Sequence, residues 1–261
     1  FLTVALAGVL AASMLFTGCS KKAESKVPDK LIVGTNAEFP PFEYMNDKKQ
    51  PEGFDIAMIK EIGKRMGKKV EIKNMEFKSL IGAMESDSIN AIIAGMTKTE
   101  KREKAVDFSD SYYTTNQAII LKKDSKITKL AQLDGKKIGV QEGTTGDLIS
   151  SGDKFGDGKK AKVLVKGAKV KRFKKGVDAV MDLKNGSVDA VVIDELTANE
   201  FVKKNAKKLK IVIDSAGSEY YCIALTKGNT AYKEEVNKQI KAIKEDGTYD
   251  KLKAKYIDSK N

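Results

Sequence analysis

Three short segments carry the side chains of this chain that are best suited to chemistry. Residues 34–43 read Gly-Thr-Asn-Ala-Glu-Phe-Pro-Pro-Phe-Glu and supply aromatic rings. Residues 94–102 contain a threonine and end in an arginine, and residues 191–195 contain the carboxylate of Asp194. A planar guanidinium is a good partner for a carboxylate, and a carboxylate is a good partner for an ammonium group. An arginine and a carboxylate facing each other across an aromatic slot therefore suit a small zwitterion.

The composition favours recognition over catalysis. The 261 residues include no histidine, which removes serine–histidine–aspartate and cysteine–histidine nucleophilic sites and the usual zinc ligand sets. We therefore expect no enzyme activity, no metal and no cofactor. The formal net charge is +12, but lysine dominates the excess and no aromatic ladder accompanies it for stacking on bases. We expect a solvated, lysine-rich surface and no nucleic-acid partner.

The first residues have the pattern of an export signal. Residues 1–18 carry no charge and are mostly apolar, and residues 15–19 read Leu-Phe-Thr-Gly-Cys. This ending resembles the signal of bacterial lipoproteins, although Phe16 stands where an aliphatic residue is usual. The resemblance implies a signal peptide over residues 1–18 and acyl chains such as palmitate on Cys19, which anchor the protein to a membrane. A transmembrane anchor is the alternative, although a span needs about 20 apolar residues.

A polar segment follows this signal and is predicted to be a flexible tether. Residues 19–29 contain few apolar side chains. Ten extended residues reach about 35 Å, so a folded domain can move above the membrane to which it is attached. Cys19 can pair with Cys222, the other cysteine, but lipidation of Cys19 leaves Cys222 as a buried residue in a strand-like run.

Apolar runs alternate with segments of helical period in the rest of the chain. Strands are predicted at residues 30–35, 69–74, 89–94, 118–121 and 136–141, and helices at residues 53–66 and 79–85. A loop over residues 142–148 is predicted to open a further helix, with Thr145 or Asp147 as its cap. This alternation predicts an α/β fold with mainly parallel sheets.

One pattern occurs twice. Residues 79–93 resemble residues 178–192, because each reads as a helix, a turn and an apolar run with Asn or Asp followed by Ala. Ile89 and Val188 are equivalent positions, so the repeat offset is 188 − 89 = 99 residues. Two similar α/β lobes explain the repeat, and chance similarity of two such segments is the alternative.

Six motifs in a fixed order carry a resemblance to one family. They are Gly-Thr-Asn-x-x-Phe-Pro-Pro-Phe-Glu, Gly-Phe-Asp-Ile, Ala-Gly-Met-Thr-x-Thr-x-x-Arg, Val-Asp-Phe-Ser-Asp-Ser-Tyr-Tyr, Gly-Thr-Thr-Gly and Asp-Ala-Val-Val-Ile-Asp. Over residues 30–258 the chain resembles the polar amino-acid-binding proteins of bacterial ABC importers. The resemblance implies the two-lobed, Venus-flytrap fold of periplasmic binding proteins. Lobe 1 would comprise residues 30–116 and 218–261, and lobe 2 residues 117–217, with hinge crossings at residues 115–117 and 216–218.

The resemblance also implies a role for each matching position. Arg102 matches the clamp on the ligand α-carboxylate, which Gly95 and Thr97 complete, and Asp194 matches the acceptor of the α-ammonium. The implied ligand-binding residues are Asn36, Glu38, Phe39, Phe54, Gly95, Met96, Thr97, Arg102, Gln141, Thr144, Thr145 and Asp194. From the residues alone, alternatives stay open: a solvated charged turn for Arg102, a helix cap for Asp194, and core packing for the two phenylalanines.

The expected ligand is a basic amino acid. Asn36, Glu38 and Gln141 match positions that meet the ligand side chain, which favours arginine, lysine or histidine; glutamine remains open and an acidic ligand is not expected. The implied protein is a monomer outside the cytoplasm that delivers a free amino acid to an ABC permease of the inner membrane. A dehydratase-like enzyme on the same fold and a sensory input domain, which requires a following transmembrane helix or kinase, are the alternatives.

Overall fold

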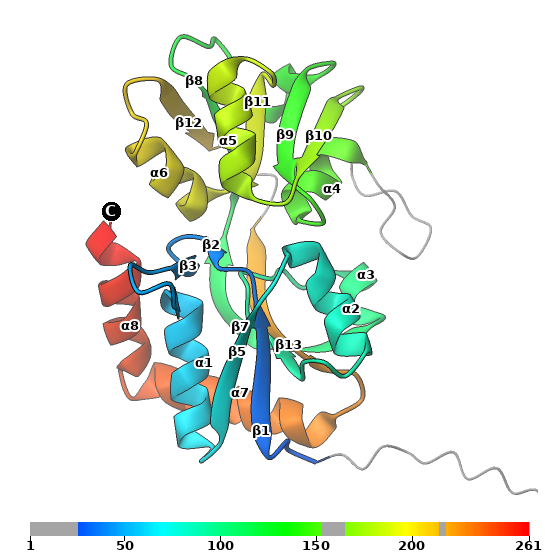
Figure 1. Ribbon diagram of the computed structural model, residues 1–261, viewed down its shortest axis with the longest axis vertical. Helices are drawn as coiled ribbons and strands as arrows, with labels where there is room; N and C mark the ends of the chain where they lie inside the picture. The colour runs from blue at the N-terminus through cyan, green and yellow to red at the C-terminus, as the bar shows by residue number, and fades with distance from the viewer. Residues whose placement is uncertain (1–25, 153–164, 214–217, 261) are drawn as a thin grey trace, which may run out of the picture.

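Each half of the molecule is built around a five-stranded sheet with helices packed on its faces (Figure 1). The computed structural model describes residues 26–152, 165–213 and 218–260. The predicted signal peptide, Cys19, most of the tether and residues 216–217 of the second hinge crossing lie outside the described residues. Among the residues described, no helix is long and apolar enough to cross a membrane.

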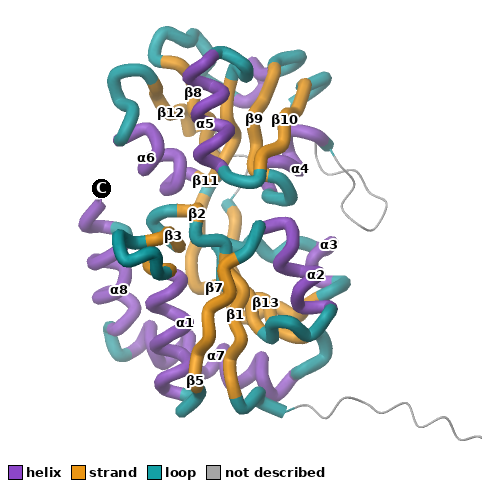
Figure 2. The backbone as a smooth tube through the Cα atoms, in the orientation of Figure 1, coloured by secondary structure: helices purple, strands orange, loops and turns teal. Residues whose placement is uncertain are grey.

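Lobe 1 contains the first and last parts of the chain. Its sheet has the strands β1 (Lys30–Thr35), β5 (Lys69–Asn74), β6 (Ala91–Ile92), β7 (Val106–Thr115) and β13 (Glu219–Thr226). Its helices are α1 (Phe54–Arg65), α2 (Leu80–Glu85), α3 (Glu100–Glu103), α7 (Thr230–Glu245) and α8 (Thr248–Tyr256), with the short helices η1 (Phe77–Ser79) and η3 (Asp258–Lys260). A small sheet of β2 (Glu38–Phe39), β3 (Glu43–Met45) and β4 (Pro51–Glu52) lies on the side facing lobe 2 (Figure 2).

Lobe 2 is formed by the middle of the chain. Its sheet has the strands β8 (Gln117–Lys122), β9 (Lys137–Gln141), β10 (Lys169–Phe173), β11 (Ala190–Asp194) and β12 (Leu209–Ile213). Its helices are α4 (Thr145–Ser151), α5 (Gly176–Asn185) and α6 (Glu195–Lys203), with the short helix η2 (Leu130–Leu133).

The two sheets have the same topology. Their strand orders are β5-β1-β6-β13-β7 and β10-β9-β11-β8-β12. In each sheet the first three strands are parallel, and the fourth is antiparallel to both of its neighbours. The repeated segments contain the helix–strand pairs α2–β6 and α5–β11, and β6 and β11 are the third strand of their sheets. This equivalence confirms the prediction of two similar α/β lobes.

The helical period fixes which face of α1 is buried. Phe54, Met58 and Ile62 repeat every four residues and are fully buried against the sheet and the C-terminal helices. Gly53 precedes α1 with φ of 130°, and a Cβ there would lie 2.2 Å from the carbonyl oxygen of Phe42. Only glycine fits such a close backbone approach, so the chain can turn into α1 directly from the Pro-Pro-Phe segment.

Two predicted boundaries differ from the structure for local reasons. The strand predicted at residues 89–94 pairs only over β6, because Gly95 has φ of 51° and turns the chain out of the sheet. The cap of α4 is Thr144, not Thr145 or Asp147, since the hydroxyl of Thr144 accepts the N–H of Asp147 at 3.2 Å. Gly95 and Thr144, the residues at these two boundaries, both line the cavity between the lobes.

Candidate functional site

A small cavity lies between the two lobes. The free space inside it is about 10 Å³, room for about one water molecule, so the side chains of the two lobes nearly fill the space between them. The residues that line it are Asn36, Phe39, Phe77, Ala94, Gly95, Thr97 and Arg102 from lobe 1 and Gln141, Thr144, Thr145 and Asp194 from lobe 2. All of the predicted ligand-binding residues line this cavity except Glu38, Phe54 and Met96.

Arg102 is a fixed cation on the lobe 1 side. It lies in α3, a single turn capped by the hydroxyl of Thr99, and its side chain is buried. Its guanidinium donates to the carbonyl oxygen of Thr97 at 2.5 Å and, across the cleft, to that of Gly143 at 3.1 Å. Burial lowers its pKa to about 10, and nearby carboxylates oppose that shift. Arg102 is therefore a buried cation at neutral pH and not part of a solvated turn.

Asp194 is the opposing carboxylate on the lobe 2 side. It ends β11, where it is buried, and its Oδ1 accepts the hydroxyl of Tyr221 at 2.6 Å. Asp194 also precedes α6, but its side chain makes no capping hydrogen bond. Burial, followed by the charge of Glu219, raises its pKa to about 7, against the hydrogen bonds from Tyr221 and Gln117. A cation that arrived beside Asp194 would favour its ionised form.

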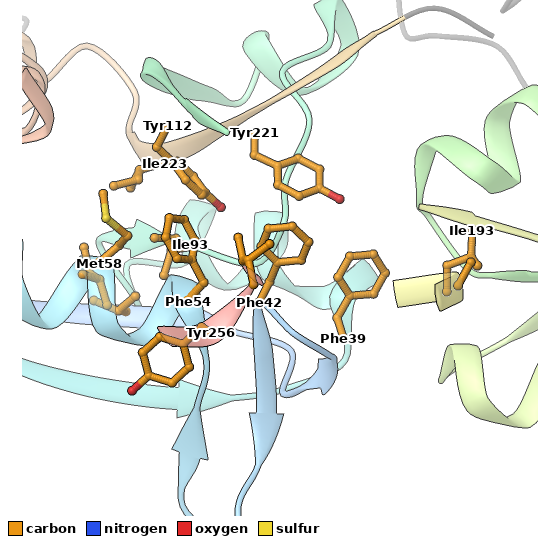
Figure 3. Close-up of a cluster of buried hydrophobic side chains, with 14 of the residues drawn as sticks. Phe39, Phe42, Phe54, Met58, Ile93, Tyr112, Ile193, Tyr221, Ile223 and Tyr256 are labelled. Carbon is orange, nitrogen blue, oxygen red and sulfur yellow. The ribbon is translucent and has the colours of Figure 1, made fainter. Parts of the chain in front are cut away.

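The remaining walls combine aromatic rings with amides. Phe39 and Phe77 supply the rings, and Phe77 also lies under the guanidinium of Arg102, 5.3 Å from ring centre to Cζ. Gln141 donates across the cleft to the Oδ1 of Asn36 at 2.8 Å. In Figure 3, Phe39 projects away from the lobe 1 cluster toward Ile193 on β11. These groups suit the side chain of a ligand whose charged ends meet Arg102 and Asp194.

A buried pair of carboxyl groups holds Gly95 in place. The N–H of Gly95 donates to the Oδ2 of Asp55 at 2.8 Å, and the hydroxyl of Tyr112 donates to the same oxygen at 2.7 Å. Burial raises the pKa of Asp55 to about 6, and burial together with the nearby charge of Asp55 raises the pKa of Glu43 well above its usual range. The N–H of Gly95 is thus engaged and is not available to a ligand carboxylate.

Three predicted site residues lie outside the cavity. Phe54 packs in the lobe 1 core beside Phe42 and Tyr112 (Figure 3), because it is the first inward-facing residue of α1. Met96 is buried in the lobe 1 cluster that contains Cys222. Glu38 is on the rim, where its carboxylate pairs with Lys175 of lobe 2 at 2.7 Å.

Ion pairs join the lobes along this rim. They connect Glu38 with Lys175 at 2.7 Å, Glu76 with Lys174 at 2.6 Å and Glu142 with Lys78 at 2.9 Å. Each pair is partly exposed and screened by solvent, so salt should weaken the contribution of these pairs to lobe closure.

Five residues at or beside the cavity were not predicted from the sequence. They are Phe77, Ala94, Gln117, Glu219 and Tyr221. Gln117 lies in the first predicted hinge crossing and Glu219 directly follows the second, and each begins a strand. Their place at the hinge is the signal in the sequence that could have identified them. Tyr221 belongs to an apolar run that resembles any buried strand. Phe77 lies between two predicted elements, Ala94 ends the strand predicted at residues 89–94, and neither carries a pattern that separates it from core residues.

Two lobes that enclose a cavity with a guanidinium on one side and a carboxylate on the other are the arrangement expected of a solute-binding protein. The family model for bacterial extracellular solute-binding proteins, family 3, matches residues 31–259. The chain belongs to this family.

Named relatives of this chain are amino-acid-binding proteins. It is 32% identical over 260 residues to the arginine-binding extracellular protein ArtP of Bacillus subtilis (strain 168), covering 98% of this chain and 97% of ArtP. An ancestral arginine-binding protein bound to arginine superposes with a TM-score of 0.80 at 42% identity, covering 89% of this chain and all of that one. The arginine-, lysine-, histidine-binding protein ArtJ of Geobacillus stearothermophilus gives 0.79 at 35% identity, covering 87% and 95%.

Proposed function

We propose that this protein captures a free amino acid between its lobes and delivers it to the permease of an ABC importer. The observation that carries the proposal is the placement of Arg102 and Asp194, both buried, on opposite lobes of one cavity. An α-amino acid has a carboxylate for Arg102 and an ammonium for Asp194. Because the two groups come from different lobes, both can hold the ligand only when the lobes are together, which couples binding to closure.

The cavity is formed by one chain, so a monomer suffices for binding. Thr144 and Thr145 of lobe 2 complete the polar surface around the ligand. The site holds its ligand and releases it unchanged to the permease. Turnover of a cyclic acid such as prephenate at this site would contradict the proposal.

The favoured ligand is a basic amino acid. Phe39 and Phe77 offer aromatic surface on which a guanidinium or an imidazolium can stack. The amides of Asn36 and Gln141 can hydrogen-bond to a polar side chain, and the rim carboxylate of Glu38 adds negative charge near the cleft. ArtP and ArtJ, whose names record arginine among their ligands, support the same choice.

A thermal-shift screen against the twenty amino acids, followed by calorimetry, tests the function and the ligand class together. We expect arginine, lysine or histidine to give the largest rise in Tm. At a hundred times Kd the ligand stabilises by about 2.7 kcal/mol, which corresponds to a Tm rise of roughly 5–10 °C for a chain of this size. Tightest binding of glutamate or of a branched aliphatic amino acid would contradict a basic ligand. Tightest binding of glutamine would make glutamine the ligand instead. The absence of a response to any amino acid would contradict the proposed function.

We also propose that Cys19 carries the lipid anchor. The apolar residues 1–18 ending in Thr17-Gly18-Cys19 motivate this, and the family is extracellular. β1 begins at the end of lobe 1 that is farthest from lobe 2 (Figure 1), so an anchor before β1 would leave the cleft free to open. Two acyl chains would give stable attachment.

The Cys19→Ala variant should leave the membrane fraction of the producing cell. The matched control is Cys222→Ala, which alters a buried cysteine and should stay with the membrane. Fractionation followed by immunoblotting measures both. If Cys19→Ala remains in the membrane fraction, the apolar segment is a transmembrane anchor instead.

A further inference from the structure

A carboxylate that directly follows the second predicted hinge crossing lies between the two lobes. Glu219 is the first residue of β13, and no motif in the sequence assigned it a role. Its Oε2 accepts the hydroxyl of Thr97 at 2.7 Å and the hydroxyl of Thr145 at 2.7 Å. Thr97 belongs to lobe 1 and Thr145 to lobe 2, and both line the cavity. One oxygen atom therefore bridges the two lobes inside the site.

This bridge fixes the direction of two hydrogen bonds. A threonine hydroxyl has one proton, so a hydroxyl that donates to Glu219 can only accept elsewhere. The oxygen of Thr145 already accepts from the Nε2 of Gln117 at 3.2 Å. The hydroxyl of Thr97 is left able to accept a hydrogen bond from an ammonium and unable to donate one to a carboxylate. This is the reverse of the role that the sequence suggested for that hydroxyl.

The charge of Glu219 also acts on both ends of the site. It is the largest of the charges that favour the protonated form of Arg102, and the charge that raises the pKa of Asp194 most. The other groups that face Asp194 are Tyr221 and Gln117, which hydrogen-bond to it, and Arg102 and Glu43, which interact with it through charge. The charge of Glu219 thus influences both the cation and the anion that are proposed to hold the ligand.

We propose that Glu219 is a positioning residue of the amino-acid site. It holds the hydroxyls of Thr97 and Thr145 as acceptors and joins the lobes through them. A bound amino acid is thereby oriented with its ammonium toward Thr97 and Asp194 and its carboxylate toward Arg102. The inference rests on the proposed function, because it concerns the orientation of an amino acid in the same cavity.

Calorimetry with L-arginine at about pH 8 tests the positioning. Glu219→Ala removes the acceptor of both hydroxyls, and we expect at least a roughly tenfold loss of affinity. Glu219→Gln keeps an oxygen acceptor at the same place and should stay within about threefold of the parent. The control Glu76→Gln breaks a rim pair between the lobes and should change affinity by less than about threefold. Affinity of Glu219→Ala within twofold of the parent, or an equal loss in Glu219→Gln, would overturn the proposal.

A double-mutant cycle keeps the test open if Glu219→Ala does not fold. Thr145→Val removes the lobe 2 half of the bridge without touching the hinge strand. If the bridge acts as one unit, adding Glu219→Met, which removes the oxygen acceptor but keeps a side chain of similar length, to Thr145→Val should change affinity differently from Glu219→Met alone, because the two residues share a hydrogen bond. Strictly additive changes would show that Glu219 and Thr145 act independently and would overturn the bridge.

A measurement without any amino acid separates this inference from the proposed function. The carboxyl carbon of Asp194 can be followed by ¹³C NMR as a function of pH. Its titration midpoint should move to lower pH in Glu219→Gln, because the nearby negative charge is lost, and stay unchanged in Glu76→Gln. If the parent does not bind arginine, the proposed ligand is wrong, but this titration still measures the effect of Glu219 on Asp194. An unmoved midpoint in Glu219→Gln overturns the inference alone.

Discussion

Arg102→Ala should abolish amino-acid binding at micromolar ligand. Arg102 is buried between the lobes, so removal of the guanidinium would leave the ligand carboxylate buried without a counter-charge. Breaking a buried pair in this way costs about 3–5 kcal/mol, and at about 1.4 kcal/mol per decade the affinity should fall several hundred-fold or more. The variant also removes the cation that interacts with Asp194 and Glu219, which should raise the pKa of Asp194 further.

The matched control for this prediction is Arg102→Lys. Lysine restores the charge but not the planar fork that reaches the carbonyl oxygens of Thr97 and Gly143, so we expect an intermediate loss. Circular dichroism and thermal unfolding should show that both variants fold cooperatively. Binding of Arg102→Ala within about tenfold of the parent would place the carboxylate site elsewhere.

Asp194→Asn should reduce affinity nearly as much. Asparagine has the same shape and can still accept the hydroxyl of Tyr221, so the loss reports the missing negative charge opposite the ligand ammonium. The expected cost is again about 3–5 kcal/mol, measured by calorimetry against the parent. A loss below about tenfold would mean that the ammonium is held by other groups.

The same variant should remove a pH dependence of binding. Burial raises the pKa of Asp194 to about 7, and the ammonium needs the ionised carboxylate. Affinity in the parent is therefore fully present above this pKa and lost as pH falls through it, by up to about tenfold per pH unit. Arg102, with a pKa of about 10, stays protonated throughout. Between about pH 8 and pH 5, affinity should be nearly constant in Asp194→Asn, and an equally steep decline there would assign the titration to another group.

Periodicity and residue type in the sequence determined the framework of this protein. The spacing of Phe54, Met58 and Ile62 predicted α1, and the repeat of residues 79–93 at residues 178–192 predicted two lobes of one topology. Both patterns can be recognised within a short segment of the sequence, because the residues that share one face of a helix or strand recur at a fixed spacing whatever that face packs against. The candidate pair Arg102 and Asp194 was also predicted, and the structure brings both to one cavity.

Only the tertiary structure decided which aromatic and polar side chains reach that cavity. Phe54 and Phe77 are equally apolar, but packing against Tyr112 and Phe42 places Phe54 in the core, while Phe77 reaches the cleft. The sequence assigned Glu38 to the ligand, but in the structure its carboxylate pairs with Lys175, which lies 137 residues later in the chain.

The hydrogen-bond direction at the site was equally out of reach of the sequence. The proton of the Thr97 hydroxyl is directed by Glu219, which lies 122 residues away along the chain. A hydroxyl can donate or accept, and its own neighbours in sequence do not choose between the two. That choice arises only where the two lobes and the hinge strand meet, because a contact between distant segments has no local pattern.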